Sequence, residues 1–313
     1  MPSPKDAFYL PDPTPLEKID WSLAKQWGVN CWIKRDDLIH PSCSGNKWYK
    51  LINNLSAMKN AGLQRLLSFG GGYSNHLHAL ALVGKLFDIE TIGVVRGDYH
   101  THLTPTLVDC LSAGMRIHYV TKSEWSLRDS VDFQSALHAR YGPAWVIPEG
   151  GNNSEGFSGC RLIASSILEQ LPQNLNRTVN LFVACGTGTT MAGLVAELPA
   201  QFNVHGISVV KGADTITQTI SEYLSKANIQ PRCRWHVHHE WHCGGYAKFP
   251  NYLANFVNRF ESETSILLDP VYTAKVLFAI AQWMENGSLV MGDHVVMLHT
   301  GGLQGRRGVT SLQ

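Results

Sequence analysis

Residues 179–190 read Val-Asn-Leu-Phe-Val-Ala-Cys-Gly-Thr-Gly-Thr-Thr. The first six form a short apolar run typical of a buried strand, and a further apolar segment, Met191–Glu197, follows the glycines. A strand, a glycine-rich turn and a helix are therefore predicted in direct succession. Such a succession is typical of a strand–helix unit in an α/β protein with a parallel sheet.

The same alternation of short apolar runs and amphipathic segments extends along the chain in both directions. Further strands are predicted at 66–69, 91–95, 116–120, 145–147, 204–210 and 295–298. Helices are predicted at 75–87, 103–113, 124–140, 155–171 and 216–227 and around 277–284. Strands and helices in this order imply right-handed crossovers and mostly parallel sheets, so the predicted fold class is α/β.

Composition narrows the class of protein. The 313 residues are 44% hydrophobic and 16% charged with a net charge of +1, which is typical of a globular protein with a sizeable core. We find no basic run that would favour nucleic acid or an anionic membrane, and no apolar stretch of membrane-spanning length. Seven cysteines without a Cys-x-x-Cys pair predict a reduced, cytoplasmic protein.

The glycine-rich turn is predicted to bind a phosphate group. Gly186 and Gly188 let the backbone approach a ligand closely, and Thr187, Thr189 and Thr190 add hydroxyl donors. Backbone N–H groups at the start of the following helix, together with the helix dipole, favour a dianion. A phosphomonoester is therefore the preferred ligand.

Two other phosphate motifs fit this turn poorly. A dinucleotide-binding turn would place a third small residue at Met191, and the next strand would end in an acid rather than in Val210-Lys211. A P-loop needs a Gly-Lys-Ser/Thr sequence, which is absent. The alternative that the glycines merely turn the chain stays open.

A second candidate is Lys47, which ends the segment Ser44-Gly45-Asn46-Lys47. A lysine amine is a nucleophile only when it is deprotonated or held as a Schiff base. The apolar residues at 48–52 would lower its pKa, whereas the ordinary alternative is a solvated surface lysine. A reactive amine and a phosphate-binding turn together are what a protein needs to hold pyridoxal phosphate.

With these features the sequence resembles the fold-type II pyridoxal-phosphate enzymes, and among them the D-cysteine desulfhydrase and 1-aminocyclopropane-1-carboxylate (ACC) deaminase family. The resemblance covers nearly the whole chain, in order. It is carried by Thr14–Leu16, Ile33–Asp37, Ser44–Lys47, Gly71–His76, Gly186–Thr190, Gly244–Tyr246, Asp269–Tyr272 and His299–Gly302.

The resemblance implies two domains of three-layer αβα architecture with mostly parallel, twisted sheets. Residues 1–48 and 151–313 would form a large domain that binds pyridoxal phosphate, and residues 49–150 a small mobile domain. It further implies a homodimer that acts on a small amino acid and needs no metal, and neither nucleic acid nor a membrane is an expected partner.

The resemblance also implies roles for individual residues. Lys47 would bind the cofactor through its amine and then act as acid and base. Ser74, Asn75 and His76 would open a helix and bind the substrate carboxylate, with Ser74 counted as catalytic and Asn75 also reaching the cofactor's ring hydroxyl. The alternative for this trio is helix capping, which is compatible with binding.

Tyr246 and Tyr272 would face the substrate as phenols that pass a proton or hold a leaving group. Without the resemblance, either would be read as a packing residue. ACC deaminases have a glutamate after the second tyrosine, where this chain has Thr273, and the C-terminal loop supplies Thr300. Neutral hydroxyl partners of the pyridine nitrogen favour β-elimination over ring opening, so Thr273 and Thr300 indicate the desulfhydrase branch.

The implied reaction is α,β-elimination and deamination of D-cysteine to pyruvate, ammonia and sulfide. The alternatives are ACC deamination to 2-oxobutyrate and ammonia, or a lyase reaction on another β-substituted amino acid such as cysteate. Tyr49, Ala274 and the segment 245–249 depart from the family pattern, which leaves the substrate open.

Some residues suggest other chemistry. His236, His238, His239, His242 and Cys243 are possible metal ligands, although a polar strand and loop explain them equally simply. A nucleotide-binding oxidoreductase would need an acid after the strand that follows the glycine turn. A ligand-binding α/β protein without catalytic activity would hold no cofactor.

Overall fold

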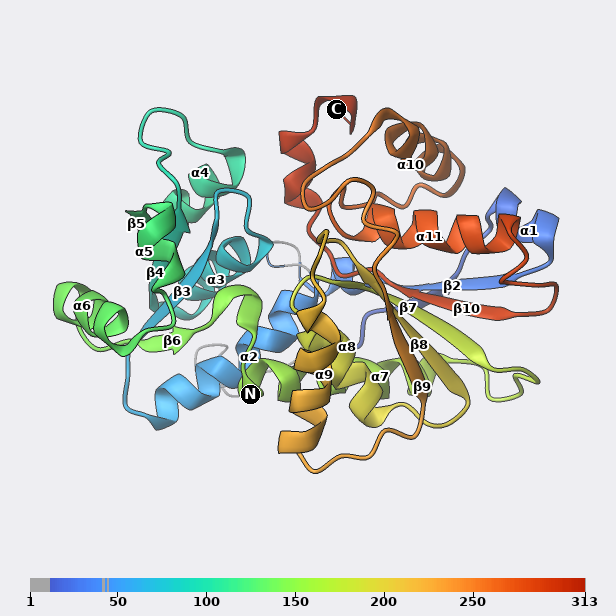
Figure 1. Ribbon diagram of the computed structural model, residues 1–313, viewed down its shortest axis with the longest axis horizontal. Helices are drawn as coiled ribbons and strands as arrows, with labels where there is room; N and C mark the ends of the chain where they lie inside the picture. The colour runs from blue at the N-terminus through green and yellow to red at the C-terminus, as the bar shows by residue number, and fades with distance from the viewer. Residues whose placement is uncertain (1–11, 41–42, 44, 313) are drawn as a thin grey trace.

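The computed structural model describes residues 12–40, 43 and 45–312 and contains a six-stranded and a four-stranded sheet (Figure 1). The strand order of the larger sheet is β1-β2-β10-β7-β8-β9. Its strands are β1 (Leu16–Lys18), β2 (Asn30–Lys34), β7 (Val179–Cys185), β8 (Phe202–Ser208), β9 (Arg234–His238) and β10 (His294–Leu298). All neighbouring strands are parallel except β1 and β2.

Helices cover both faces of the larger sheet (Figure 1). On one face lie α1 (Ser22–Trp27), α10 (Asn251–Thr264) and α11 (Thr273–Glu285). On the other lie α2 (Asn46–Asn60), α7 (Ser154–Gln170), α8 (Thr189–Glu197) and α9 (Thr215–Lys226). Successive side chains of a strand point to opposite faces, so Phe182 and Ala184 join one core while Leu181 and Val183 join the other.

The four strands of the smaller sheet are all parallel and run in the order β5-β4-β3-β6. They are β3 (Arg65–Gly71), β4 (Glu90–Arg96), β5 (Arg116–Val120) and β6 (Trp145–Ile147). The connecting helices are α3 (Asn75–Phe87), α4 (Pro105–Ser112), α5 (Lys122–Ser126) and α6 (Val131–Tyr141). The strands of this sheet all come from residues 65–147, and those of the larger sheet from outside that range.

The predicted α/β class with mostly parallel sheets is confirmed. The single helix predicted at 124–140 is wrong, because two helices form there. Thr121 and Glu124 make a capping box at the start of α5, and Ser130 begins α6 by accepting a hydrogen bond from the Phe133 N–H. The boundaries proposed for the two domains, and the mobility of the smaller one, stay predictions.

Close packing of α7 on α2 depends on Gly159. A Cβ at this position would overlap the carbonyl oxygen of Tyr49. We therefore expect Gly159→Ala to lower the free energy of unfolding by about 3 kcal/mol, because neither helix backbone can move without disturbing the core. Ser158→Ala, at the exposed neighbouring position, should change it by less than about 0.5 kcal/mol. Equal free energies of unfolding for the two variants, measured by urea denaturation, would contradict this packing.

Candidate active site

A cavity of about 480 Å³ lies where the carboxyl ends of strands from both sheets meet. Ligands of open α/β proteins bind in this position, because the loops after parallel strands converge there. The residues predicted for the site that line this cavity are Lys47, Ser74, Asn75, His76, Gly186, Thr187, Gly188, Thr190, Tyr246, Tyr272 and Thr300. The structure thus brings together segments that lie up to 253 residues apart in the sequence (Lys47 to Thr300).

Lys47 is the second residue of α2 and is half-buried. Gly45 begins the helix with a φ of 85°, and a Cβ there would overlap the Thr300 carbonyl oxygen. Only glycine allows this close approach, which fixes Lys47 beside the C-terminal loop. Burial, together with the nearby Lys50 ammonium, holds the pKa of Lys47 well below its ordinary value. Ser44 lies outside the described residues.

The glycine-rich turn connects β7 to the N-terminus of α8, as predicted. Gly188 has a φ of 85° and directly precedes α8, so the N-terminus of this helix, where N–H groups have no partner within the helix, lies at the cavity. Thr190 accepts a hydrogen bond from the Asn46 side chain at 2.8 Å, which leaves its own hydroxyl proton for a ligand. Thr189, also predicted to contact the cofactor, is fully buried and does not line the cavity, and its hydroxyl donates to the Asn152 side chain at 2.6 Å.

Lys50 also lines the cavity and was not predicted from the sequence. It follows Lys47 by three residues on α2, is 2% exposed, and donates to the Gly150 carbonyl at 2.9 Å. Burial lowers its pKa, and a bound dianion would favour its charged form. The spacing of three on a predicted helix was the available signal, since it places both amines on one face.

Ser74 and Asn75 begin α3. The Ser74 hydroxyl accepts a hydrogen bond from the Leu77 N–H at 3.2 Å, so the capping role is confirmed. Asn75 accepts a hydrogen bond from the Gln304 side chain at 2.7 Å and therefore directs its NH₂ group away from Gln304. That NH₂ group lies 3.5 Å from the Asp269 carboxylate.

His76 is buried, with one free nitrogen at the cavity. Ser68 donates its hydroxyl proton to the Ile147 carbonyl at 2.7 Å, so Nε2 of His76 must donate to the Ser68 oxygen at 2.9 Å. Nδ1 then carries a lone pair and has no partner among the described residues. Burial, with the charges of Lys47 and Lys50, holds the pKa of His76 well below its ordinary value, so the ring is neutral.

Tyr246 and Tyr272 both line the cavity and lie next to each other, with the Tyr272 hydroxyl donating to the Tyr246 oxygen. Their hydroxyl oxygens are 3.5 Å apart and their rings meet edge to face with centroids 6.1 Å apart. Burial raises the pKa of both phenols, that of Tyr272 well above its ordinary value. Both are therefore neutral hydroxyls able to donate a proton.

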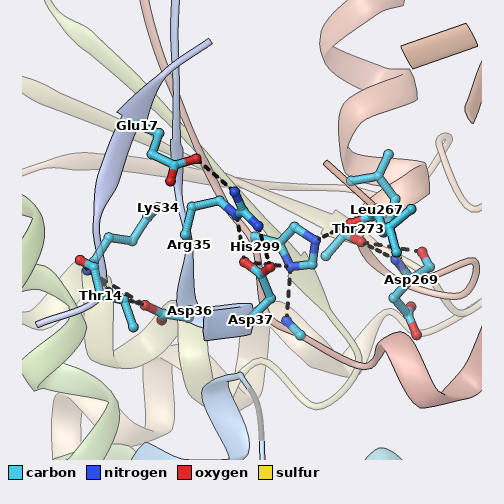
Figure 2. Close-up of polar contacts among 12 residues, drawn as sticks. Thr14, Glu17, Lys34, Arg35, Asp36, Asp37, Leu267, Asp269, Thr273 and His299 are labelled. Carbon is cyan, nitrogen blue, oxygen red and sulfur yellow. Dashed lines mark hydrogen bonds and ion pairs between the residues drawn. The ribbon is translucent and has the colours of Figure 1, made fainter. Parts of the chain in front are cut away.

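His299 ties the loops of the site together (Figure 2). Its Nε2 donates to the Leu267 carbonyl at 2.7 Å, and its Nδ1 accepts from the Gly301 N–H at 3.2 Å and lies 3.6 Å from the Asp37 carboxylate. Asp37 in turn accepts two hydrogen bonds from Arg35. The backbone N–H of His299 also donates to the Lys34 carbonyl at 2.9 Å, and this hydrogen bond connects the run at 33–37 to the Thr300 loop.

Asp269 shapes the start of α11. One carboxylate oxygen accepts hydrogen bonds from the N–H groups of Val271 and Tyr272 at 2.9 and 2.6 Å. Thr273 accepts from the Asp269 N–H at 2.8 Å, is fully buried and does not line the cavity (Figure 2). Of the two threonines considered as partners of a pyridine nitrogen, only Thr300 lines the cavity.

Burial raises the pKa of Asp269 from 3.8 to about 7. Between pH 4 and 7 the folded chain therefore holds a proton that the unfolded chain has lost, so stability falls as the pH rises. We expect the unfolding free energy of the cofactor-free wild type to fall, relative to Asp269→Asn, by up to about 1.4 kcal/mol per pH unit in this window. If the difference in unfolding free energy between wild type and Asp269→Asn, measured by urea titration, does not vary with pH, Asp269 is not protonated in this way.

The histidine-rich segment takes part in other contacts. His238 lies 3.2 Å from His205 and 3.6 Å from Glu240, and Nδ1 of His242 accepts from the Gly244 N–H. No group of three or more metal-ligating side chains forms within the part of the chain that the structure describes. All seven cysteines are buried and free. None of the helices formed by the described residues has the length and apolarity to cross a bilayer.

The cavity residues fit pyridoxal phosphate. The N-terminus of α8 and the Lys50 amine suit the phosphate, Asn75 and Thr300 offer groups for the ring hydroxyl and ring nitrogen, and Lys47 offers an amine of lowered pKa for the aldehyde. Every one of these groups belongs to a single cavity. The phosphate cradle and the reactive lysine, predicted separately from the sequence, are thus parts of one site.

Comparisons with known proteins show the family of the chain. Residues 8–301 match the family described as pyridoxal-phosphate dependent enzyme. The mitochondrial bifunctional D-cysteine desulfhydrase/ACC deaminase of Arabidopsis thaliana is 30% identical, with 97% of this chain and 80% of the relative covered. D-Cysteine desulfhydrase of Serratia proteamaculans is 25% identical, with 92% of this chain and 91% of the relative covered.

A solved structure described as an ACC deaminase homologue shares the fold. Its TM-score is 0.83 at 24% identity, over 97% of this chain and 95% of its own. The chain therefore belongs to the pyridoxal-phosphate dependent enzymes, in the family that includes the D-cysteine desulfhydrases and ACC deaminases.

Proposed function

We propose that the enzyme converts D-cysteine and water to pyruvate, ammonia and hydrogen sulfide. The observation that carries the proposal is the neutral Thr300 hydroxyl at the cavity. Glu149 is the single carboxylate among the described cavity-lining residues, and it lies 3.9 Å from the Arg128 guanidinium. A ring nitrogen beside a hydroxyl stays largely neutral, which suits loss of a good leaving group such as a thiol.

Different residues of the chain bind the substrate and transfer its proton. When bound, pyridoxal phosphate supplies an aldehyde that takes the substrate amine and a ring that withdraws electrons from Cα. The first turn of α3, from Ser74 to His76, binds the substrate carboxylate through its N–H groups. Lys47 removes the proton from Cα, since burial favours its free amine.

Tyr246 and Tyr272 receive the leaving sulfur. Their hydroxyl oxygens, 3.5 Å apart, can contact one atom between them, and either can protonate a departing thiolate. Both phenols keep their protons at neutral pH because burial raises their pKa values. We place Tyr246 and Tyr272 at the β-carbon side of the substrate for this reason.

Two other substrates are favoured by single observations. ACC is favoured by the name of the Arabidopsis relative, which carries both activities. An amino acid with an anionic β-substituent, such as cysteate, is favoured by Arg96, which lines the cavity and whose guanidinium lies 5.5 Å from the centroid of the Trp125 ring. Either reaction would use the same amine and carboxylate contacts.

Product analysis tests the proposal. The purified enzyme is incubated separately with D-cysteine, L-cysteine, ACC and cysteate, and pyruvate, 2-oxobutyrate, sulfide and sulfite are measured. We expect D-cysteine to give pyruvate and sulfide in equal amounts, and to have the highest kcat/KM of the four substrates. The matched variant Tyr272→Phe should reduce this rate by about 10²-fold or more. 2-Oxobutyrate from ACC, or sulfite from cysteate, as the dominant product would overturn the assignment.

A further inference from the structure

Lys275 is a fully buried lysine that has no role in the reaction proposed above. It lies on α11 with 0% of its surface exposed, and its amine donates to the Gly245 carbonyl at 2.7 Å. No carboxylate forms an ion pair with it among the residues that the structure describes, and burial lowers its pKa to about 8 although Cys243 and Asp269 act in the opposite direction. Burying an amine is costly unless its hydrogen bonds are made, so the contact with Gly245 has a structural or functional reason.

The turn that contains Gly245 is conformationally strained. Cys243, Gly244, Gly245 and Ala247 all have positive φ angles, of 51°, 95°, 115° and 57°. For Cys243 and Ala247 such angles are unfavourable, and they persist only where surrounding contacts hold them. The turn is also exposed, because 46% of the Tyr246 surface is accessible.

Both tyrosines of the site therefore depend on the start of α11. Tyr272 immediately precedes α11, and Lys275, three residues after Tyr272, lies in the first turn of the helix. The Lys275 amine reaches the carbonyl directly before Tyr246, whose hydroxyl lies 3.5 Å from that of Tyr272. The start of α11 thus positions Tyr272 directly and is joined to the turn of Tyr246 by the hydrogen bond from Lys275, while the backbone bonds from Gly245 to His242 and from Lys248 to Gly245 lie within the turn itself.

We propose that Lys275 is a positioning residue that holds the 243–247 turn through the Gly245 carbonyl and so keeps the Tyr246 hydroxyl against that of Tyr272. The inference rests on the role proposed above for Tyr246. A methionine would fill the same volume without the cost of burying an amine, which argues that Lys275 serves the turn rather than the core.

Two measurements on the cofactor-loaded enzyme test the proposal. The first is amide hydrogen exchange at residues 244–247 in wild type, Lys275→Met and Lys275→Gln, with Lys248→Met at the exposed end of the same turn as control. We expect exchange to be faster by about tenfold or more in Lys275→Met, less so in Lys275→Gln, which keeps a donor, and unchanged in Lys248→Met.

The second measurement is a double-mutant cycle on kcat with Tyr246→Phe. Lys275→Met alone should lower kcat by about tenfold to 100-fold, but have little further effect in the Tyr246→Phe background, because both changes remove the same positioned hydroxyl. Equal losses in both backgrounds, or unchanged hydrogen exchange, would overturn the proposal. Faster exchange with full activity of Tyr246→Phe would support the hold by Lys275 and refute instead the catalytic role given to Tyr246.

Discussion

Lys47→Ala is expected to abolish turnover and the visible absorption band of the lysine-bound cofactor. The variant loses both the amine that takes the cofactor aldehyde and the base that removes the Cα proton, so kcat should fall by about 10³-fold or more. The phosphate contacts at α8 and Lys50 are untouched. The variant should therefore still bind pyridoxal phosphate, with the spectrum of a free aldehyde.

The control for this change is Lys226→Ala, an exposed lysine on α9 remote from the cavity, which should keep the wild-type spectrum and rate. Absorption spectra and product assays on the three proteins decide the matter. A Lys47→Ala protein that keeps the wild-type band would show that another lysine holds the cofactor.

Lys50→Met is expected to weaken binding of pyridoxal phosphate by about 100-fold, or about 2.7 kcal/mol. Lys50 is the one fully buried lysine among the described residues that line the cavity. Methionine keeps the volume and removes the charge. The measurement is titration of the cofactor-free protein with pyridoxal phosphate, followed by absorbance.

The unphosphorylated analogue pyridoxal provides the control for Lys50→Met. Wild type and variant should bind pyridoxal with similar affinity, since the lost interaction involves only the phosphate. A loss of the same size for both compounds would show that Lys50 supports the cavity in general and does not pair with the phosphate.

Much of the fold was predictable because its strands are short apolar runs bounded by glycine or polar residues. The strand at Val179–Cys185 and the helix after Gly188 are an example, since periodicity and turn chemistry agree there. By contrast, β1 has only three residues, and β2 runs directly into the charged residues at 34–37, so neither shows a usable period. The helix predicted at 124–140 failed because local caps at Thr121 and Ser130 outweigh helix propensity between them.

The candidate site was predictable where its chemistry is local. Lys47 and the glycine-rich turn each stand out within a few residues of sequence. Side-chain direction is not local, so the sequence could not show that Thr189 and Thr273 turn away from the cavity. Nor could it show contacts between distant segments, such as the hydrogen bond from Gln304 to Asn75 across 229 residues.

The central claim is that Lys47 holds pyridoxal phosphate in this cavity. The most direct test is to reduce the purified enzyme with borohydride, digest it and locate the modified lysine by mass spectrometry. We predict the added mass of the reduced cofactor on Lys47 alone. Modification of Lys50 instead, or of no lysine in a protein saturated with pyridoxal phosphate, would contradict the account.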